Sequence, residues 1–166
     1  GFADAMNHLL VDSDRHMGTV EALRTLGIAE RVDRVYICEN HPHPETGEPS
    51  TSMRFEWTRE GVEPTINQPQ WQNQGYHSTG VSRWYETLAT GSTVAGITRE
   101  LPACERPILE GDDILSILMV PIVVDNKFWG YIGFDDCHCE RRWSKSEESI
   151  LIAIAASIGG ALQRHR

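Results

Sequence analysis

The chain has 166 residues, of which 40% are hydrophobic and 23% charged, and its formal net charge is −9. This length predicts one globular domain. Nucleic acids and anionic membranes attract basic surfaces, so the acidic balance argues against both as partners. No apolar run approaches the about 18 residues that a membrane-spanning helix needs, and no signal peptide is recognisable, so we expect a cytoplasmic protein without membrane insertion.

The cysteines and the chain ends carry further expectations. Without a secretory context, the four cysteines are expected to be free thiols; they are Cys38, Cys104, Cys137 and Cys139. The chain has no initiator Met and ends inside a helical pattern, which is typical of a piece of a longer protein. We expect residues 1–10 to be the remnant of an upstream connecting helix and residues 11–166 to form a single domain.

The first third of the chain predicts a helix followed by a β-hairpin. Residues 2–29 carry apolar side chains at helical spacing, and Gly27 is a plausible stop because glycine tolerates the positive φ of a helix end. Residues 32–39 and 52–58 alternate and predict two paired strands, with Met53, Phe55 and Trp57 on one face. Between them, residues 41–50 are polar and rich in proline, which predicts a loop.

The middle of the chain predicts short elements after a long loop. Residues 59–80 are dominated by Gly, Pro, Asn and Gln, and a loop of this length inside a domain is usually functional or mobile. Residues 82–89 predict a short helix ended by Gly91, residues 93–98 a third strand, and residues 104–110 another short helix.

The region from 114 to 134 predicts the central hairpin of a sheet. Two apolar runs, Ile114–Val124 and Phe128–Phe134, flank Asp125-Asn126-Lys127, whose Asp and Asn tolerate a tight turn. Both faces of these strands are apolar, so we expect them to be covered on both sides. Pro121 is interpreted as a bulge, and the two glycines of the second strand, Gly130 and Gly133, as points where a backbone or a ring approaches closely.

The last segment predicts a helix with more apolar surface than one sheet face can cover. Ser144 and Glu147 have the spacing of a capping box. The apolar stripe is formed by Leu151, Ile154, Ile158 and Leu162, and the small flank by Ala153, Ser157 and Gly160. The N-terminal residues Met6, Leu9 and Leu10 offer a matching apolar edge. We expect a two-fold dimer with the terminal helices at its centre, unless the two helices of one chain cover each other.

The segment MVPIVVDNKFWGYIGFDDCHCERRWSKSE, followed by the helix at 148–162, resembles the GAF domain family, the small-molecule sensor modules of bacterial signalling proteins. Weaker likeness extends to residues 31–40, 83–91 and 98–116. The resemblance implies an α+β fold, with a central antiparallel sheet of about six strands and the terminal helices on one face. It also implies a non-catalytic regulatory role, in which the state of the domain passes through the terminal helices to an output domain such as a histidine kinase or a cyclic-dinucleotide enzyme.

In this family a pocket lies on the other sheet face, beneath the long middle segment. The motif-matched lining candidates are Trp84, Tyr85, Arg99, Cys104, Met119 and Tyr131. A small molecule of unknown identity would bind there, or the domain would be a structural dimerisation module. Arg99 is expected to be buried and so to need an anionic partner; the candidates are Glu86, Glu100 and Asp112.

Alternative chemistries rest on the cysteines, since no catalytic motif is recognisable. Cys104 precedes the strand around Pro121 at nearly the spacing of the bilin-bearing cysteine of phytochromes, but Glu105 follows it where phytochromes usually have His. A bilin-binding photosensor and a small thiol-dependent redox enzyme remain as alternatives, although no cofactor is required. Cys137, His138 and Cys139 offer soft metal ligands, yet neighbouring strand residues point to opposite faces, so no metal is expected.

Overall fold

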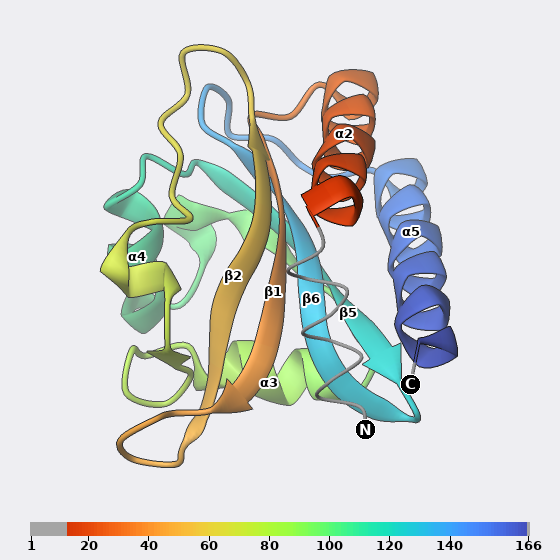
Figure 1. Ribbon diagram of the computed structural model, residues 1–166. Helices are drawn as coiled ribbons and strands as arrows, with labels where there is room; N and C mark the ends of the chain where they lie inside the picture. The colour runs from red at the N-terminus through yellow and green to blue at the C-terminus, as the bar shows by residue number, and fades with distance from the viewer. Residues whose placement is uncertain (1–12, 166) are drawn as a thin grey trace.

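A six-stranded antiparallel sheet in the order β3-β2-β1-β6-β5-β4 forms the centre of the molecule (Figure 1). The computed structural model describes residues 13–165. The strands are β1 Arg34–Pro42, β2 Pro49–Thr58, β3 Gln74–Gly75, β4 Val94–Ile97, β5 Ser116–Val124 and β6 Lys127–Asp136. This is the predicted fold class, with helices α2 and α5 on one face of the sheet and shorter helical segments on the other.

The β5–β6 hairpin lies inside the sheet, as its two apolar faces predicted. Its turn is formed by Asp125 and Asn126, whose φ angles of 52° and 61° are those of a tight hairpin turn. The prediction of a bulge at Pro121 is wrong, because the pairing passes from Ile122–Gly130 to Val123–Phe128 and leaves Trp129 of β6 as the extra residue. Pro121 itself stays in register, and it is tolerated because β4 begins at Val94, opposite Met119, so that among the described strands none pairs with β5 at Pro121 on that side.

The β1–β2 hairpin is longer than predicted and contains a bulge of its own. Its strands pair as far as Pro42 and Pro49, so the loop spans only residues 43–48 rather than 41–50. The register shifts at Ile37 and Cys38, which lie opposite Phe55 and Met53. Phe55 therefore packs with the terminal helices while Met53 packs on the opposite face, and the prediction that they share a face is wrong.

Two long antiparallel helices, α2 (Ser13–Glu30) and α5 (Lys145–Arg164), cover one face of the sheet (Figure 1). The predicted capping box of α5 is confirmed, since Ser144 and Glu147 exchange both hydrogen bonds. The line nearest the sheet comprises Leu151, Ala155, Gly159 and Leu162. Ile154 and Ile158, which the sequence placed on that line, are partly buried beside it.

Helix α2 does not stop at Gly27, contrary to the prediction. It continues to Glu30, and Arg31 takes the positive φ of 57° that ends it. Gly27 is instead a packing position, because a Cβ there would lie 2.1 Å from the ring of Trp57. The predicted helix before residue 13, the boundary at residue 10 and the apolar edge of Met6, Leu9 and Leu10 lie outside the described residues.

The opposite sheet face is covered by the middle of the chain. Its helical segments are η1 Pro69–Trp71, α3 Ser82–Ala89, η2 Thr98–Glu100, η3 Ala103–Glu105 and α4 Arg106–Glu110. The predicted helices at 82–89 and 104–110 are thus confirmed, whereas β3 was not predicted from the long loop. Among the helices of residues 13–165, none combines the length and the hydropathy needed to cross a bilayer.

Candidate functional site

The sheet face beneath the middle segment, where a pocket was predicted, is filled by side chains. Trp84, Met119 and Tyr131 are 0%, 1% and 0% exposed, so all three are buried. They belong to one apolar cluster that also contains Tyr36, Met53, Trp71 and Tyr76. Three of the six predicted lining residues therefore meet in one place, but as a packed core.

Buried charges lie at one end of this core. The Arg34 guanidinium donates to Asp135 Oδ2 at 3.2 Å and to the carbonyl oxygen of Asp112 at 3.2 Å. Burial raises the pKa of Asp135 to about 7, although the Arg34 guanidinium acts in the opposite direction. The Asp135 carboxylate also interacts with the Tyr36 hydroxyl, and the Tyr131 hydroxyl with the Cys38 thiol. Buried polar groups usually have partners of this kind, and these groups form the polar end of a core that is otherwise apolar.

A buried carboxylate, that of Glu105, holds helix α3 on this face of the sheet; Glu105 is 1% exposed. Its carboxylate accepts hydrogen bonds from the Trp84 indole at 2.8 Å and from Arg83 at 2.6 and 2.7 Å. Glu105 stands where phytochromes usually have His after the bilin-bearing cysteine. In this structure it joins α3 to the segment before α4. Nothing in the sequence spacing pointed to this pair.

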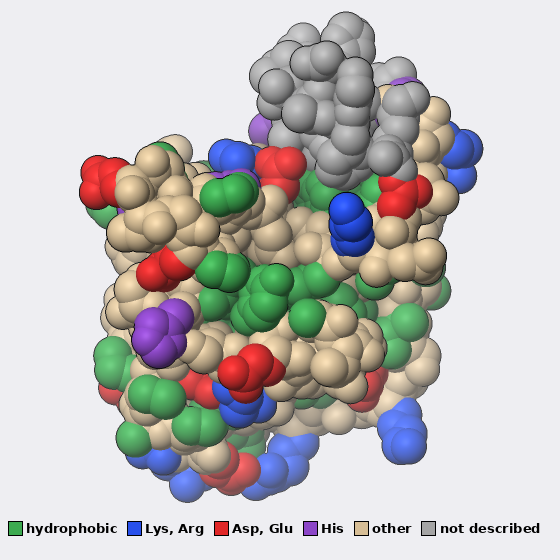
Figure 2. Space-filling model, turned by 90° about the horizontal axis from the view of Figure 1, so that it is seen from below, with side chains coloured by type: hydrophobic (Ala, Val, Ile, Leu, Met, Phe, Trp, Pro, Cys, Tyr) green, Lys and Arg blue, Asp and Glu red, His purple; other side chains and the backbone are tan. Residues whose placement is uncertain are grey.

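Tyr85 lies at the edge of the core, where the face opens to solvent. Its ring is 36% exposed and packs edge-on against Tyr76 at 5.1 Å and Phe128 at 5.5 Å between centroids. Hollows of about 270 and 150 Å³ border Tyr85 on the sides of Pro42 and Glu86. The end of the molecule that carries α3 and the β5–β6 turn is seen in Figure 2, where hydrophobic side chains gather in the middle of the face.

Arg99 and Cys104 lie outside this core. The expectation of a buried Arg99 is wrong, because its side chain is 67% exposed. It forms a bidentate ion pair with Glu140 at 2.8 and 3.1 Å, and Glu100 lies 4.0 Å away. The thiol of Cys104 is exposed as well. Sequence spacing placed both residues near the middle segment but could not show on which side of it they point.

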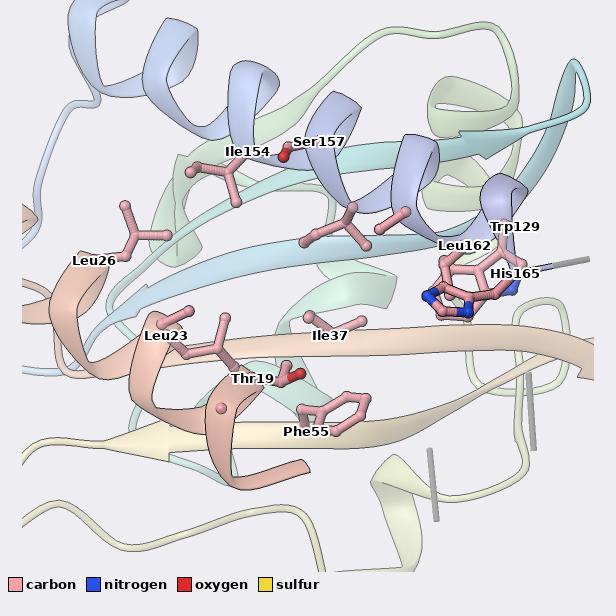
Figure 3. A pocket seen from close by; sticks show the side chains of 14 residues that line it. Thr19, Leu23, Leu26, Ile37, Phe55, Trp129, Ile154, Ser157, Leu162 and His165 are labelled. Carbon is pink, nitrogen blue, oxygen red and sulfur yellow. The ribbon is translucent and has the colours of Figure 1, made fainter. Parts of the chain in front are cut away.

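A larger hollow, of about 540 Å³, lies on the opposite sheet face between α2 and α5, and we call it the helix groove. Figure 3 shows Leu23 and Leu26 from α2 and Ile154 and Leu162 from α5 pointing into it, above Ile37 and Phe55 of the sheet. Trp129, the extra residue of the bulge in β6, also turns its side chain toward this groove. Its volume is in the range of small-molecule pockets. Sequence analysis missed the groove because it treated these residues only as helix and sheet contacts.

Comparison with known proteins identifies the family. The family sequence model of the GAF domain matches residues 18–162. The chain belongs to the GAF domain family. This GAF domain is 45% identical over 164 residues to the methanogenesis regulatory histidine kinase FilI of Methanothrix harundinacea, a match that covers 99% of the chain and 18% of that protein. The chain thus spans less than a fifth of the length of this relative.

Solved structures similar to this GAF domain include light-sensing proteins. One is GAF3 from Slr1393 of Synechocystis sp. PCC6803, with 22% identity and a TM-score of 0.70, covering 90% of this chain and 94% of that one. Another is the PixJ GAF domain of Thermosynechococcus elongatus, with 18% identity and a TM-score of 0.69, covering 91% and 86%. At these identities the likeness shows a shared fold.

The Cys137-His138-Cys139 segment forms a turn closed by carboxylates. Oxygen or nitrogen atoms of Asp33, Asp136 and His138 lie within 4.8 Å of one another, and neither cysteine belongs to the group. Asp33 Oδ2 accepts from the backbone N–H of Cys137 at 2.6 Å, and Asp136 Oδ1 accepts from those of His138 and Cys139 at 2.9 Å. Because these oxygens already accept hydrogen bonds, the cluster has a sufficient structural role as the closure of the turn.

Proposed function

We propose that this GAF domain is the regulatory sensor of a histidine kinase, a member of a two-component system. The observation that carries the proposal is the 45% identity, over 99% of the chain, with the regulatory histidine kinase FilI. Identity at this level extends through both terminal helices and the middle segment, so the surfaces that would contact neighbouring domains are included in the match. The role of the domain is regulatory, and the kinase reaction belongs to another part of the protein.

The signal would pass through α2 and α5, which lie on the face opposite the middle segment (Figure 1). β5 and β6 link the two faces, because Met119 and Tyr131 point into the core beneath the middle segment while Leu118 and Ile132 point toward the terminal helices. A closely packed sheet transmits small displacements from one face to the other. Packed helices respond to such displacements by shifting between discrete arrangements.

A small molecule would enter beneath the middle segment past Tyr85, whose partly exposed ring packs against Tyr76 and Phe128. The residues beneath it are buried, so binding requires that Tyr85 and Tyr76 move apart, and the Tyr131 hydroxyl would then be able to hydrogen-bond to the molecule. In this interpretation the structure corresponds to a closed form of the sensor, in which Tyr85 and Tyr76 cover the site. The alternative that the domain serves only as a structural dimerisation module requires no such opening.

A domain exchange tests the proposal. The matching segment of FilI is replaced by this chain, and autophosphorylation of the purified chimera is compared with that of FilI and of FilI lacking the segment. We expect the chimera to retain kinase activity near that of FilI and different from that of the deletion. A chimera that behaves like the deletion contradicts a regulatory role in a kinase of this type.

Native mass spectrometry of the purified chain tests the binding part separately. A bound small molecule that is lost when Tyr131 is replaced by Phe supports entry beneath the middle segment. A molecule retained by Tyr131→Phe but lost by Leu23→Trp, which fills the helix groove, would place the ligand on the other face.

A further inference from the structure

The side chain of Arg141 joins the end of α2 to the start of α5. Its guanidinium donates to the carbonyl oxygens of Glu30 at 2.8 Å and Arg31 at 3.0 Å, where α2 ends. The same group forms an ion pair with Glu147 in the first turn of α5. The side chain is only 20% exposed, so these bonds are shielded from water and from salt.

Charge favours this bridge at both ends. The last carbonyl groups of a helix carry partial negative charge and attract a cation, while an acidic side chain is favoured in the first turn of the next helix. Glu147 uses its second oxygen to accept the backbone N–H of Ser144 at 2.7 Å, which closes the capping box. One carboxylate therefore fixes the start of α5 and holds the arginine that fixes the end of α2.

Further contacts hold Arg141 itself in place. Its backbone N–H donates to the Ser116 hydroxyl at 2.7 Å, at the first residue of β5. Asp136, the last residue of β6, lies 3.8 Å from the guanidinium, which also stacks on the Trp143 ring at 4.6 Å. The bridge is thus anchored to the beginning and the end of the central hairpin.

Farther from this bridge, the helix groove lies between α2 and α5. There Thr19 in the first half of α2 and Leu162 in the last turn of α5 both line the hollow (Figure 3). The antiparallel helices (Figure 1) are therefore bridged where α2 ends and α5 begins, and within residues 13–165 the helix groove lies between them toward their other ends. Those other ends lead toward the two ends of the chain.

We propose that Arg141 is a positioning residue of the signal relay, the pivot about which α2 and α5 open and close over the helix groove. The inference rests on the proposed function, since it assigns a mechanism to the terminal-helix relay. With the bridge in place, a displacement of the β5–β6 hairpin moves the end of α2 and the start of α5 together. Without it, the same displacement moves the two helices independently.

Hydrogen exchange on the chain tests the bridge. The backbone N–H groups of Arg31 and Val32 bond to Ile28 and Gly27 at the end of α2, so their exchange reports on that end. We expect Arg141→Ala to speed their exchange by about tenfold, as the loss of charged hydrogen bonds predicts. Arg142→Ala is the matched control, because Arg142 is exposed and bonds only to Glu100 among the contacts resolved for its side chain within residues 13–165. The control should leave the exchange of Arg31 and Val32 unchanged.

A second variant separates the bridge from local folding. Glu147→Gln keeps an acceptor for the capping box but removes the charge that pairs with Arg141. We expect this change in α5 to speed exchange of Arg31 and Val32 in the other helix by several fold. Unchanged exchange at both amides in Glu147→Gln overturns the bridge, even if Arg141→Ala does not fold.

The kinase chimera tests the role in the relay. We expect Arg141→Ala to change its autophosphorylation rate at least threefold, and Arg142→Ala to leave the rate as it is. Equal rates in the two variants overturn the positioning role. If the unmodified chimera is as inactive as the deletion, the proposed kinase function fails, while the exchange measurements on the chain still decide whether the bridge exists.

Discussion

The ring of Tyr36 lies directly across Gly133, where a Cβ would come within 2.5 Å of the ring carbon Cε2. The two residues face each other in neighbouring strands β1 and β6, and Tyr36 is 3% exposed. Gly133→Ala should therefore destabilise the domain by about 1–3 kcal/mol, because the buried ring must shift to make room. Urea unfolding followed by tryptophan fluorescence measures the change.

Gly18→Ala is the matched control for this substitution. A Cβ at Gly18 would meet no atom of the described part of the chain within 4 Å, and the residue lies inside α2. Alanine is favoured over glycine in a helix by about 0.5–1 kcal/mol, so this variant should be slightly more stable than the wild type. A loss of stability in Gly18→Ala equal to that in Gly133→Ala would mean that the Tyr36 contact does not cause the effect.

Local patterns predicted the fold well where each residue's role depends on its neighbours in sequence. The turn at Asp125 and Asn126 and the capping box of Ser144 and Glu147 are decided within a few residues, and both were correctly predicted. Bulges defeated the same reasoning, because an extra residue reverses the alternation of side chains that the strand pattern assumes. The separation of Met53 from Phe55 is the consequence.

The candidate site was harder to predict because it depends on long-range contacts. Spacing alone placed Met119 and Tyr131 in the core but could not show that side chains fill it. The exposure of Arg99 follows from Glu140, a partner 41 positions away that no local pattern links to it. Arg141 has no motif at all, since its carbonyl partners at the end of α2 are recognisable only in the folded chain.

The four free cysteines should differ widely in reactivity in the folded domain. Cys104 and Cys139 are exposed, whereas Cys38 is buried and its burial raises the pKa of the thiol to about 12. Because the thiolate is the reacting species, Cys104 and Cys139 should be labelled by a maleimide at neutral pH well before Cys38. Mass spectrometry of labelled peptides gives the order. In urea without reductant all four should react, and two unreacted thiols would indicate a disulfide and favour the redox alternative.

Asp135 should make stability depend on pH across the neutral range. Its pKa is about 7 in the folded protein, against an ordinary value of 3.8, because burial disfavours the charged form. The folded state thus holds this proton more tightly than the unfolded chain does. The resulting stabilisation is fully present below about pH 4 and is lost as the pH rises to about 7, by up to about 1.4 kcal/mol per pH unit.

The variant Asp135→Asn isolates this contribution, since other acidic groups titrate equally in both proteins. The unfolding free energy of the wild type minus that of Asp135→Asn should fall between about pH 4 and 7 and stay constant above about pH 8. A difference that instead rises with pH would mean that the Arg34 guanidinium holds the pKa of Asp135 below its ordinary value.

The outer face of α5 predicts the oligomeric state. Ile152 is 46% exposed and continues with Ala153 and Ala156 into an apolar stripe that faces away from the sheet. Small side chains let a second helix approach closely, and two-fold pairing buries the same stripe of both copies. We expect sedimentation at micromolar concentration to give a dimer. Ala156→Glu should shift it to a monomer, because pairing would bring two unpaired carboxylates together in an interface that excludes water.

Ala89→Glu is the control, because it adds the same charge to the exposed end of α3 and should leave the dimer intact. A wild-type chain that sediments as a monomer would contradict the predicted dimer, and the signal relay would then not depend on pairing of two α5 helices.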